Sequence, residues 1–333
     1  MLQQELWKVA QHKESSDFKN YVSSFEVPQS KSLLNLTHTK SGDSITHVLA
    51  RHGKLDMLKW VHEEWHVQLE SVNLEGKLPL HEAAAAGHVQ IVEYLLSQGV
   101  QIDPLKRSGW TPLMMACTKP KNLKLITLLA NSGSNLHRLN KDGWNCFHIA
   151  CRNADLAMIK FLAGYGGQLT DTISKNGRTP LHTAALHGRS HVVEFLINDL
   201  KSRTDMRDSC GSTPFMDAIR SGNETAIQII LDNYPQCYQD CNTMGYTCMH
   251  IAAEAGQVQS IMFLVNKCAM NVNCQINVGN IFKGQTPLHF AHKENNIDAV
   301  DVLKRLGASC EIIDSKGRKA YELTNRRTWA STS

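Results

Sequence analysis

Six histidines recur along the chain and are the first candidates for chemistry. They are His47, His81, His148, His182, His250 and His289. Imidazole nitrogens bind zinc and transfer protons, but both roles need several side chains to converge on one point. Each of these histidines lies in its own copy of a short motif, so we expect them about one motif period apart. We predict that each one hydrogen-bonds nearby backbone and that none of them binds a metal.

Cysteines are the second candidates, and they are densest at Cys237, Cys241 and Cys248, with Cys268 and Cys274 beyond. Zinc sites usually contain close cysteine pairs, and these spacings do not match them. The sequence places the first three on a helix end, a turn and a helix start. We therefore predict small core side chains and no metal, and leave open whether any thiol is reactive.

Lysine amines and tryptophan rings flank recurring glycines, where a partner could reach them. These residues are Lys106, Arg107, Trp110, Lys141, Trp144 and Lys175. Because exposed tryptophan and arginine are favoured interface anchors, Trp110, Trp144 and Arg107 are predicted partner-binding residues. Simple packing within the turns is the alternative for the tryptophans, and a solvated turn charge is the alternative for the lysines.

The elements that position these side chains follow one motif: glycine, any residue, Thr-Pro-Leu-His, any residue, alanine. Copies of varying strength start at Gly42, Gly76, Gly109, Gly143, Gly177, Gly211, Gly245, Gly284 and Gly317. Successive glycines are 34, 33, 34, 34, 34, 34, 39 and 33 residues apart. This motif and period resemble those of ankyrin repeats. They predict an all-α solenoid of about nine stacked helix-turn-helix repeats with β-turn fingers.

The residue types within one repeat explain its two helices. Thr179 can cap the first helix through its hydroxyl, and Pro180 suits the first helical position because its missing N–H is not needed there. Gly188 then ends the helix, and a second helical apolar pattern follows. Helices this short are marginal alone, so we expect each repeat to bury its apolar face against its neighbours in one continuous stack.

The two ends and one insertion depart from the period. Residues 1–41 lack the motif but carry spaced apolar side chains, which predicts an N-terminal capping helix pair before the repeats of residues 42–316. Residues 317–333 predict a C-terminal half-repeat and a tail. The 39-residue spacing places about five extra residues within 273–283. This insertion is either a tolerated surface loop, which we favour, or a contact loop.

Composition narrows the class of protein. Among 333 residues, 42% are hydrophobic and 20% are charged, which is typical of a folded soluble protein. The net charge of +4 is too small and too scattered to predict a nucleic-acid surface. The polar N-terminus does not resemble a signal peptide, and no apolar run reaches the roughly 20 residues that span a membrane. Ten cysteines without a secretory signal predict reduced thiols and a cytosolic or nuclear monomer.

Several stretches resemble one vertebrate family more closely, that of ankyrin repeat domain-containing protein 16. They are LARHG at 49–53, PLHEAA at 79–84, WTPLMMACT at 110–118, NKDGWNCFHIA at 140–150 and RTPLHTAALHG at 178–188. The resemblance implies that the protein binds the catalytic domain of alanyl-tRNA synthetase. It also implies that lysine side chains accept serine that the synthetase has wrongly activated, which prevents mischarging of tRNA(Ala). No cofactor is implied.

The motifs assign the acceptor lysines of that family to particular positions here. Lys141 lies in the matching NKDGW segment, and Lys106 lies where the family has two adjacent lysines. The second of that pair is Arg107, which keeps the charge but supplies no amine. The third acceptor position falls at Asp171, with Lys175 nearby as a substitute acceptor. These departures leave open whether the capture chemistry accompanies binding.

Two functions from different classes therefore follow from the sequence. One is a translation-fidelity co-regulator of alanyl-tRNA synthetase that accepts seryl groups. The other is a generic adaptor that holds another protein without covalent chemistry. We do not expect an enzyme, because the sequence has no Gly-rich phosphate loop after a strand and no recognisable Ser, His and Asp nucleophile motif.

Overall fold

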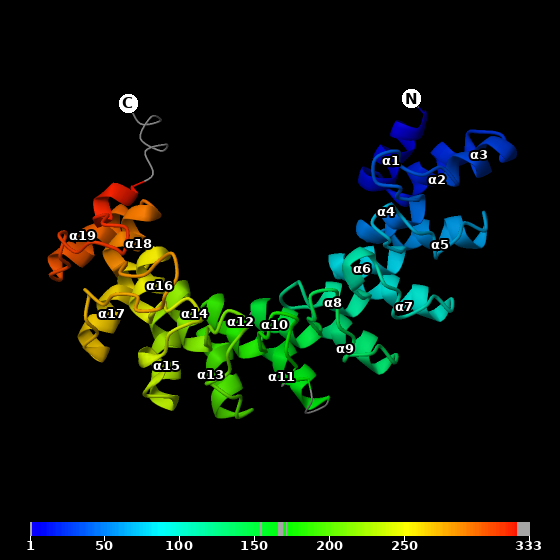
Figure 1. The fold of residues 1–333 in the computed structure, drawn as a ribbon. Helices are drawn as coiled ribbons and strands as arrows, with labels where there is room; N and C mark the ends of the chain where they lie inside the picture. Colours follow the sequence, from blue (N-terminus) through cyan, green and yellow to red (C-terminus); the bar gives the residue numbers. More distant parts are fainter. Residues whose placement is uncertain (1, 154, 166–168, 171, 325–333) are drawn as a thin grey trace. The chain divides into compact units, whose positions relative to one another are not determined.

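A computed structural model describes residues 2–153, 155–165, 169, 170 and 172–324, which fold into helices joined by loops (Figure 1). The chain divides into two compact units, Met1–Leu169 and Thr170–Ser333, and each is a stack of helix pairs. Among the described residues no helix is long and apolar enough to cross a membrane.

The described residues of unit 1 form three N-terminal helices, four helix pairs and one 3₁₀ turn. The N-terminal helices are α1 (Leu2–His12), α2 (Ser15–Ser23) and α3 (Val27–Leu34). The pairs are α4 (Ile45–Arg51) with α5 (Leu55–Glu63), α6 (Pro79–Ala86) with α7 (Val89–Ser97), α8 (Pro112–Ala116) with α9 (Leu123–Asn131), and α10 (Cys146–Asn153) with α11 (Leu156–Gly164). The turn η1 (Arg107–Gly109) lies in a finger. First helices pack on first helices and second helices on second helices.

Unit 2 repeats this arrangement. Its pairs are α12 (Pro180–Leu186) with α13 (Ser190–Asn198), α14 (Pro214–Ser221) with α15 (Glu224–Asn233), α16 (Cys248–Glu254) with α17 (Val258–Cys268), and α18 (Pro287–Lys293) with α19 (Ile297–Arg305). Two 3₁₀ turns, η2 (Cys237–Gln239) and η3 (Ala320–Leu323), complete it. The motif at Gly317 thus leads into η3, which packs on α18. The predicted tail from residue 325 lies outside the described residues.

The all-α repeat solenoid predicted from the sequence is confirmed, with eight helix pairs in the described residues. Residues 1–41 were predicted to form a capping pair of helices, but the structure has three helices there. Pro28 lies at the start of α3 and favours a new helix. Ser30 then donates its hydroxyl to the Val22 carbonyl oxygen at 2.8 Å, which ties α3 back to α2.

The first helix α12 begins as the sequence predicted. In α12, Pro180 occupies the first turn and the Thr179 hydroxyl accepts the His182 N–H. The His182 imidazole in turn accepts the Thr179 N–H at 3.2 Å, so histidine takes the reciprocal capping role that glutamate often has. Two otherwise unpaired backbone donors are satisfied within one turn, which is why a helix of seven residues can start here.

The motif glycines are needed for close stacking as well as for their backbone angle. Gly211 has φ +73°, and a Cβ there would lie 2.9 Å from the backbone nitrogen of Thr243 in the next finger. Gly317 has the same φ, +73°, but a Cβ there would meet nothing within 4 Å. The two positions therefore separate the cost of the left-handed backbone from the cost of the lost space.

We expect Gly211→Ala to lower the free energy of unfolding by about 3 kcal/mol and Gly317→Ala by about 1 kcal/mol. The larger loss has two parts, because the new methyl group also displaces the hydrogen bond from Thr243 N–H to the Cys210 carbonyl oxygen, which is 3.0 Å long. Urea denaturation followed by circular dichroism measures both values. Equal losses would show that the backbone angle alone sets the cost.

Candidate functional site: the finger loops

Each finger is a tight turn that ends at a motif glycine. In the finger at Gly143, the Asn140 carboxamide oxygen accepts the backbone N–H groups of Asp142 and Trp144, both at 2.9 Å. Asparagine and aspartate favour this turn because their short side chains reach the backbone two residues ahead. The same turn forms around Asn73, Asp208, Asn242 and Asp314.

Backbone hydrogen bonds then join successive fingers within unit 1. Arg107 N–H donates to the Glu75 carbonyl oxygen at 2.8 Å, and Lys141 N–H donates to the Ser108 carbonyl oxygen at 2.9 Å. Arg107 and Lys141 therefore hold equivalent positions in neighbouring fingers, and both side chains are exposed. The arginine, and not Lys106, is the structural counterpart of Lys141.

Lys106 occupies the place where other fingers have the turn-forming asparagine or aspartate. Without that side chain, the finger forms the 3₁₀ turn η1, and Ser108 takes a left-handed φ of 73°. Such a conformation is uncommon for a residue other than glycine and costs about 1–3 kcal/mol. The Lys106 ammonium lies over the Trp110 ring, 5.7 Å from its centroid.

The two predicted tryptophan anchors are half-buried. Trp144 stacks on the His148 ring with centroids 5.9 Å apart and an interplanar angle of 25°. Trp110 carries the Lys106 ammonium on its face. Both rings thus pack within their own repeats and remain partly exposed, so packing and partner binding stay compatible.

Lys175 lies in unit 2, exposed, and two residues before Gly177, as Lys141 lies two residues before Gly143. Its finger uses Ser174 as the turn residue, whose hydroxyl accepts the Arg178 N–H at 3.0 Å. Lys175 is therefore the counterpart of Lys141 within unit 2. Asp171, the third acceptor position by resemblance, lies outside the described residues.

The predicted bonding to backbone is confirmed for the motif histidines other than His148. Five of them accept a backbone N–H at Nδ1 and donate from Nε2 to the carbonyl oxygen after the next motif glycine: His47 to Lys77 (2.8 Å), His81 to Trp110 (3.2 Å), His182 to Ser212 (3.1 Å), His250 to Gln285 (3.1 Å) and His289 to Arg318 (3.1 Å). This pattern needs the neutral tautomer with its proton on Nε2. Burial lowers the pKa of His81, His182 and His250 to about 4, so they stay neutral at pH 7.

His148 differs from the other five. Its Nδ1 lies 2.8 Å from the Asn145 carboxamide oxygen, which is an acceptor, so Nδ1 must carry a proton. The cap residue explains the change, since Asn145 stands where the other repeats have serine, threonine or leucine. In both arrangements Nδ1 bonds the cap residue of its own helix.

Cys237 and Cys248 are buried, whereas Cys241 is exposed on the turn that follows η2. Burial raises the pKa of the Cys237 and Cys248 thiols, which disfavours the nucleophilic thiolate. Within the described residues, no group of three or more His, Cys, Asp or Glu side chains could hold a metal ion. The core assignment is thus confirmed for Cys237 and Cys248 and wrong for Cys241.

The structure adds a Cys–His neighbour pair that the sequence did not reveal. The Cys274 sulfur lies 3.9 Å from Nδ1 of His250. That nitrogen already accepts the Thr247 N–H, and burial lowers the pKa of His250 and raises that of Cys274. The imidazole is therefore poorly placed to activate the thiol as a base.

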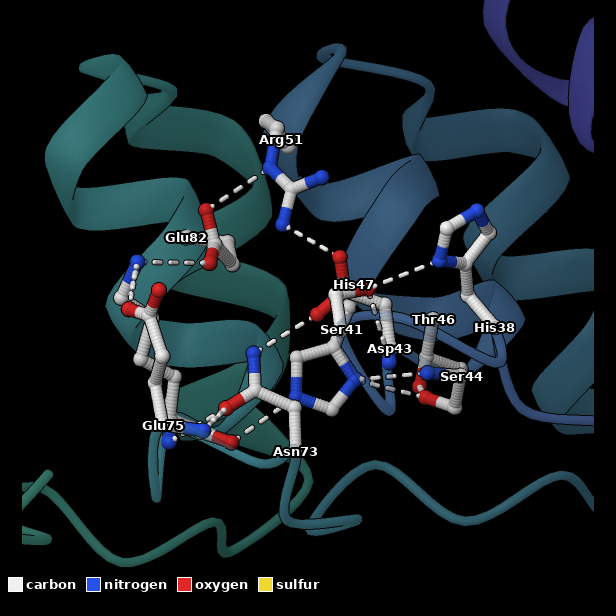
Figure 2. Close-up of polar contacts among 11 residues, drawn as sticks. His38, Ser41, Asp43, Ser44, Thr46, His47, Arg51, Asn73, Glu75 and Glu82 are labelled. Carbon is white, nitrogen blue, oxygen red and sulfur yellow. Dashed lines mark hydrogen bonds and ion pairs between the residues drawn. The ribbon is translucent and has the colours of Figure 1, made fainter.

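The structure also contains a buried charge network between α4 and α6 that was not predicted from the sequence (Figure 2). Arg51 donates to Asp43 at 2.7 Å and to Glu82 at 2.9 Å, and Asn73 donates to Asp43 at 2.6 Å. Burial alone would raise the pKa of both carboxyl groups, but hydrogen bonds and the Arg51 charge outweigh it and lower both. Lys77 adds a contact to Glu82 at 3.3 Å.

Unit 2 contains a related pair at the equivalent position of α14. Arg178 reaches Asp217 at 2.6 Å and Asp208 at 3.2 Å. Asp217 is more deeply buried, and burial raises its pKa to about 6 despite the nearby guanidinium. In both units, an arginine thus joins a finger to the first helix of a repeat.

Comparison with known proteins agrees with this architecture. A family model described as ankyrin repeats in three copies matches residues 46–140, 113–208, 147–244, 200–276 and 236–314. Similar proteins include an L-asparaginase of Dirofilaria immitis (42% identical over 23% of this chain and 13% of that protein). Mouse ankyrin repeat domain-containing protein 13B is 32% identical over 25% of this chain and 13% of that protein. Mouse protein phosphatase 1 regulatory subunit 27 is 32% identical over 20% of this chain and 44% of that protein.

Each of these similarities thus spans less than half of the relative's own length. The family model, in contrast, covers most of this chain from residue 46 to residue 314. Its extent coincides with the helix pairs and fingers described above. The chain belongs to the ankyrin-repeat family.

Proposed function

We propose that this protein is a non-enzymatic, protein-binding scaffold that docks on the catalytic domain of alanyl-tRNA synthetase through the fingers at Gly109 and Gly143. Lys141 and Lys106 then accept seryl groups that the synthetase has wrongly activated. The observation that carries the proposal is the placement of Lys141, an exposed amine on a finger fixed by its own turn and by a 2.9 Å hydrogen bond to the preceding finger.

The capture step needs only a positioned amine. A neutral lysine Nζ attacks the carbonyl carbon of seryl adenylate, an amide bond forms, and AMP leaves with the bonding electrons while the amine loses a proton to solvent. Free lysine has a pKa near ~10.4, so roughly a thousandth is neutral at pH 7. A docked amine offsets this through its high effective concentration.

Lys141 is the stronger acceptor of the two. Its side chain is exposed, whereas the Lys106 ammonium must leave the Trp110 ring before it can react. Arg107, at the position equivalent to Lys141, contributes charge to binding but no amine. In unit 2, Lys175 holds the equivalent position and is a further candidate acceptor.

We also propose that the protein is a monomer with reduced thiols, located in the cytosol and also in the nucleus.

The experiment incubates the full chain with the synthetase catalytic domain, serine and ATP, and searches its peptides for seryl-lysine by mass spectrometry. We expect Lys141→Arg to remove most of the modification and Lys106→Arg a smaller part, with affinity for the catalytic domain changed less than about twofold. Lys267→Arg, at an exposed lysine of α17, is the matched control. Unchanged modification in the double variant would overturn the acceptor assignment.

Binding is measured separately by calorimetry. We expect Trp110→Ala and Trp144→Ala each to weaken binding about tenfold, because tryptophan anchors often dominate an interface. Indifference to both would show that these fingers are the wrong surface.

A generic adaptor without covalent chemistry is the second candidate, favoured by Arg107 at the position where an amine would be needed. One similar protein is named as a regulatory subunit of protein phosphatase 1, a name that fits a role in binding another protein. Absence of any binding to the synthetase domain would favour this candidate.

A further inference from the structure

The extra residues between the fingers at Gly245 and Gly284 form a loop with its own hydrogen bonds. Asn280 donates its side-chain N–H to the Met244 carbonyl oxygen at 2.8 Å, and its carboxamide oxygen accepts the Phe282 N–H at 2.9 Å. Gly284 N–H closes the loop on the Ile276 carbonyl oxygen at 2.8 Å. The Asn280 side chain thus replaces the backbone N–H donor that joins other fingers.

This loop turns two apolar side chains inward, Ile276 and Phe282, and two outward. Phe282 packs edge-on against Tyr246, with ring centroids 5.4 Å apart, and anchors the loop to α18 through Phe290. Val278 and Ile281, in contrast, are 42% and 65% exposed. Exposed aliphatic side chains on a loop that already has an anchor contribute little to folding.

Met244, at the tip of the preceding finger, extends the same apolar surface. It is 36% exposed, and its carbonyl oxygen is held by Asn280. Val278 lies directly over Gly245, where a Cβ would meet it at 2.7 Å. Met244 and Val278 are therefore neighbours, and together with Ile281, three residues further along the same loop, they form what we call the insertion patch.

The edge of the insertion patch is basic. Lys283 and Lys316 are exposed, and the 3.0 Å hydrogen bond from Ser315 N–H to the Lys283 carbonyl oxygen brings their fingers together. In the part of the chain that the structure describes, no ion pair engages either lysine. The nearby carboxylates are already paired, Asp314 with Arg318 at 2.7 Å and Glu294 with Lys293 at 3.0 Å.

We propose that the insertion patch is a second docking surface, separate from the fingers that carry Lys106 and Lys141. Its occupant is an extended segment of a partner protein in which aliphatic side chains are followed by carboxylates. The aliphatic side chains would cover Val278 and Ile281, and the carboxylates would meet Lys283 and Lys316. A nucleic acid would satisfy the lysines but would leave the aliphatic surface uncovered.

The test selects a phage-displayed library of random 12-residue peptides on the full chain, with counter-selection on the Val278→Ser/Ile281→Ser variant. Enriched peptides are synthesised with a fluorophore and titrated by fluorescence polarisation. We expect sequences with leucine or isoleucine next to aspartate or glutamate. Their affinity should fall about tenfold with Ile281→Ser and about threefold with Lys283→Glu, and should weaken as salt rises.

Ile297→Ser is the matched control, since that isoleucine is also exposed, at 56%, but lies on α19. Because Ile281 is largely solvent-exposed, its replacement should leave the thermal unfolding curve unchanged, which separates lost binding from lost folding. Enrichment no greater than on the variant, peptides without acidic residues, or equal binding of a 12-nucleotide single-stranded RNA would each overturn the proposal. None of these outcomes depends on binding to the synthetase.

Discussion

Three buried histidines and one buried aspartate should together remove about 4 kcal/mol from the free energy of unfolding, summed over the two units, when the pH falls from 7 to 5. Burial lowers the pKa of His81, His182 and His250 from 6.5 to about 4. At a pH between these two pKa values, the three histidines are mostly protonated in the unfolded chain and mostly neutral in the folded chain. The stability that the neutral imidazoles provide is therefore complete above ~pH 6.5 and is lost as the pH falls toward ~4.

One carboxyl group opposes this loss. Burial raises the pKa of Asp217 to about 6, so the folded chain takes up a proton there before the unfolded chain does. Acidification through that range favours folding. At pH 5, the three histidines together subtract roughly 5 kcal/mol and Asp217 returns roughly 1 kcal/mol, which gives the net value above.

The measurement is urea denaturation at pH 7, 6 and 5. His182→Gln should reduce the loss of unfolding free energy between pH 7 and pH 5 by about one third of the histidine contribution, because glutamine does not titrate. His191→Gln, at an exposed position of α13, is the surface control. A free energy of unfolding that is equal at pH 7 and pH 5 would contradict the structural role of the imidazoles.

The histidines show what a repeat sequence can predict. Thr179, Pro180 and His182 lie within four residues, and their capping roles follow from local helix geometry. The acceptor of the other imidazole nitrogen lies one period ahead, so a constant period predicts its location too. Local structure and period together therefore account for the fold and for five of the six histidines.

Features that depend on residues that depart from the motif, or on packing against a neighbouring repeat, could not be predicted from local helix geometry and the repeat period. Lys106 replaces a turn-forming residue, and only the structure shows that Ser108 then adopts a positive φ and that Arg107 becomes the counterpart of Lys141. For the insertion, the sequence analysis favoured a tolerated surface loop over a contact loop. The inward turn of Phe282 and the outward turn of Ile281 depend on packing against α18, which the spacing of glycines does not specify.

Arg51 is the clearest case, because its two partners lie 8 and 31 residues away. Replacing it with methionine should lower the free energy of unfolding of unit 1 by about 3 kcal/mol, since two buried carboxylates lose their main cation. Asp43 and Glu82 are only 4% and 5% exposed. The loss stays below the upper range for buried pairs because the Arg51 side chain is 36% exposed and Lys77 remains beside Glu82.

Two comparisons separate the loss of charge from the loss of side-chain volume. Arg203→Met removes the same side chain from an exposed ion pair with Asp205 and should cause no measurable change. The pH dependence gives a second readout. In the folded protein the pKa of Asp43 and Glu82 is lowered, so their contribution is present above the unfolded pKa and is lost as the pH falls. The difference between wild type and Arg51→Met should therefore shrink from pH 6 to pH 3, whereas a difference caused by packing alone would stay constant.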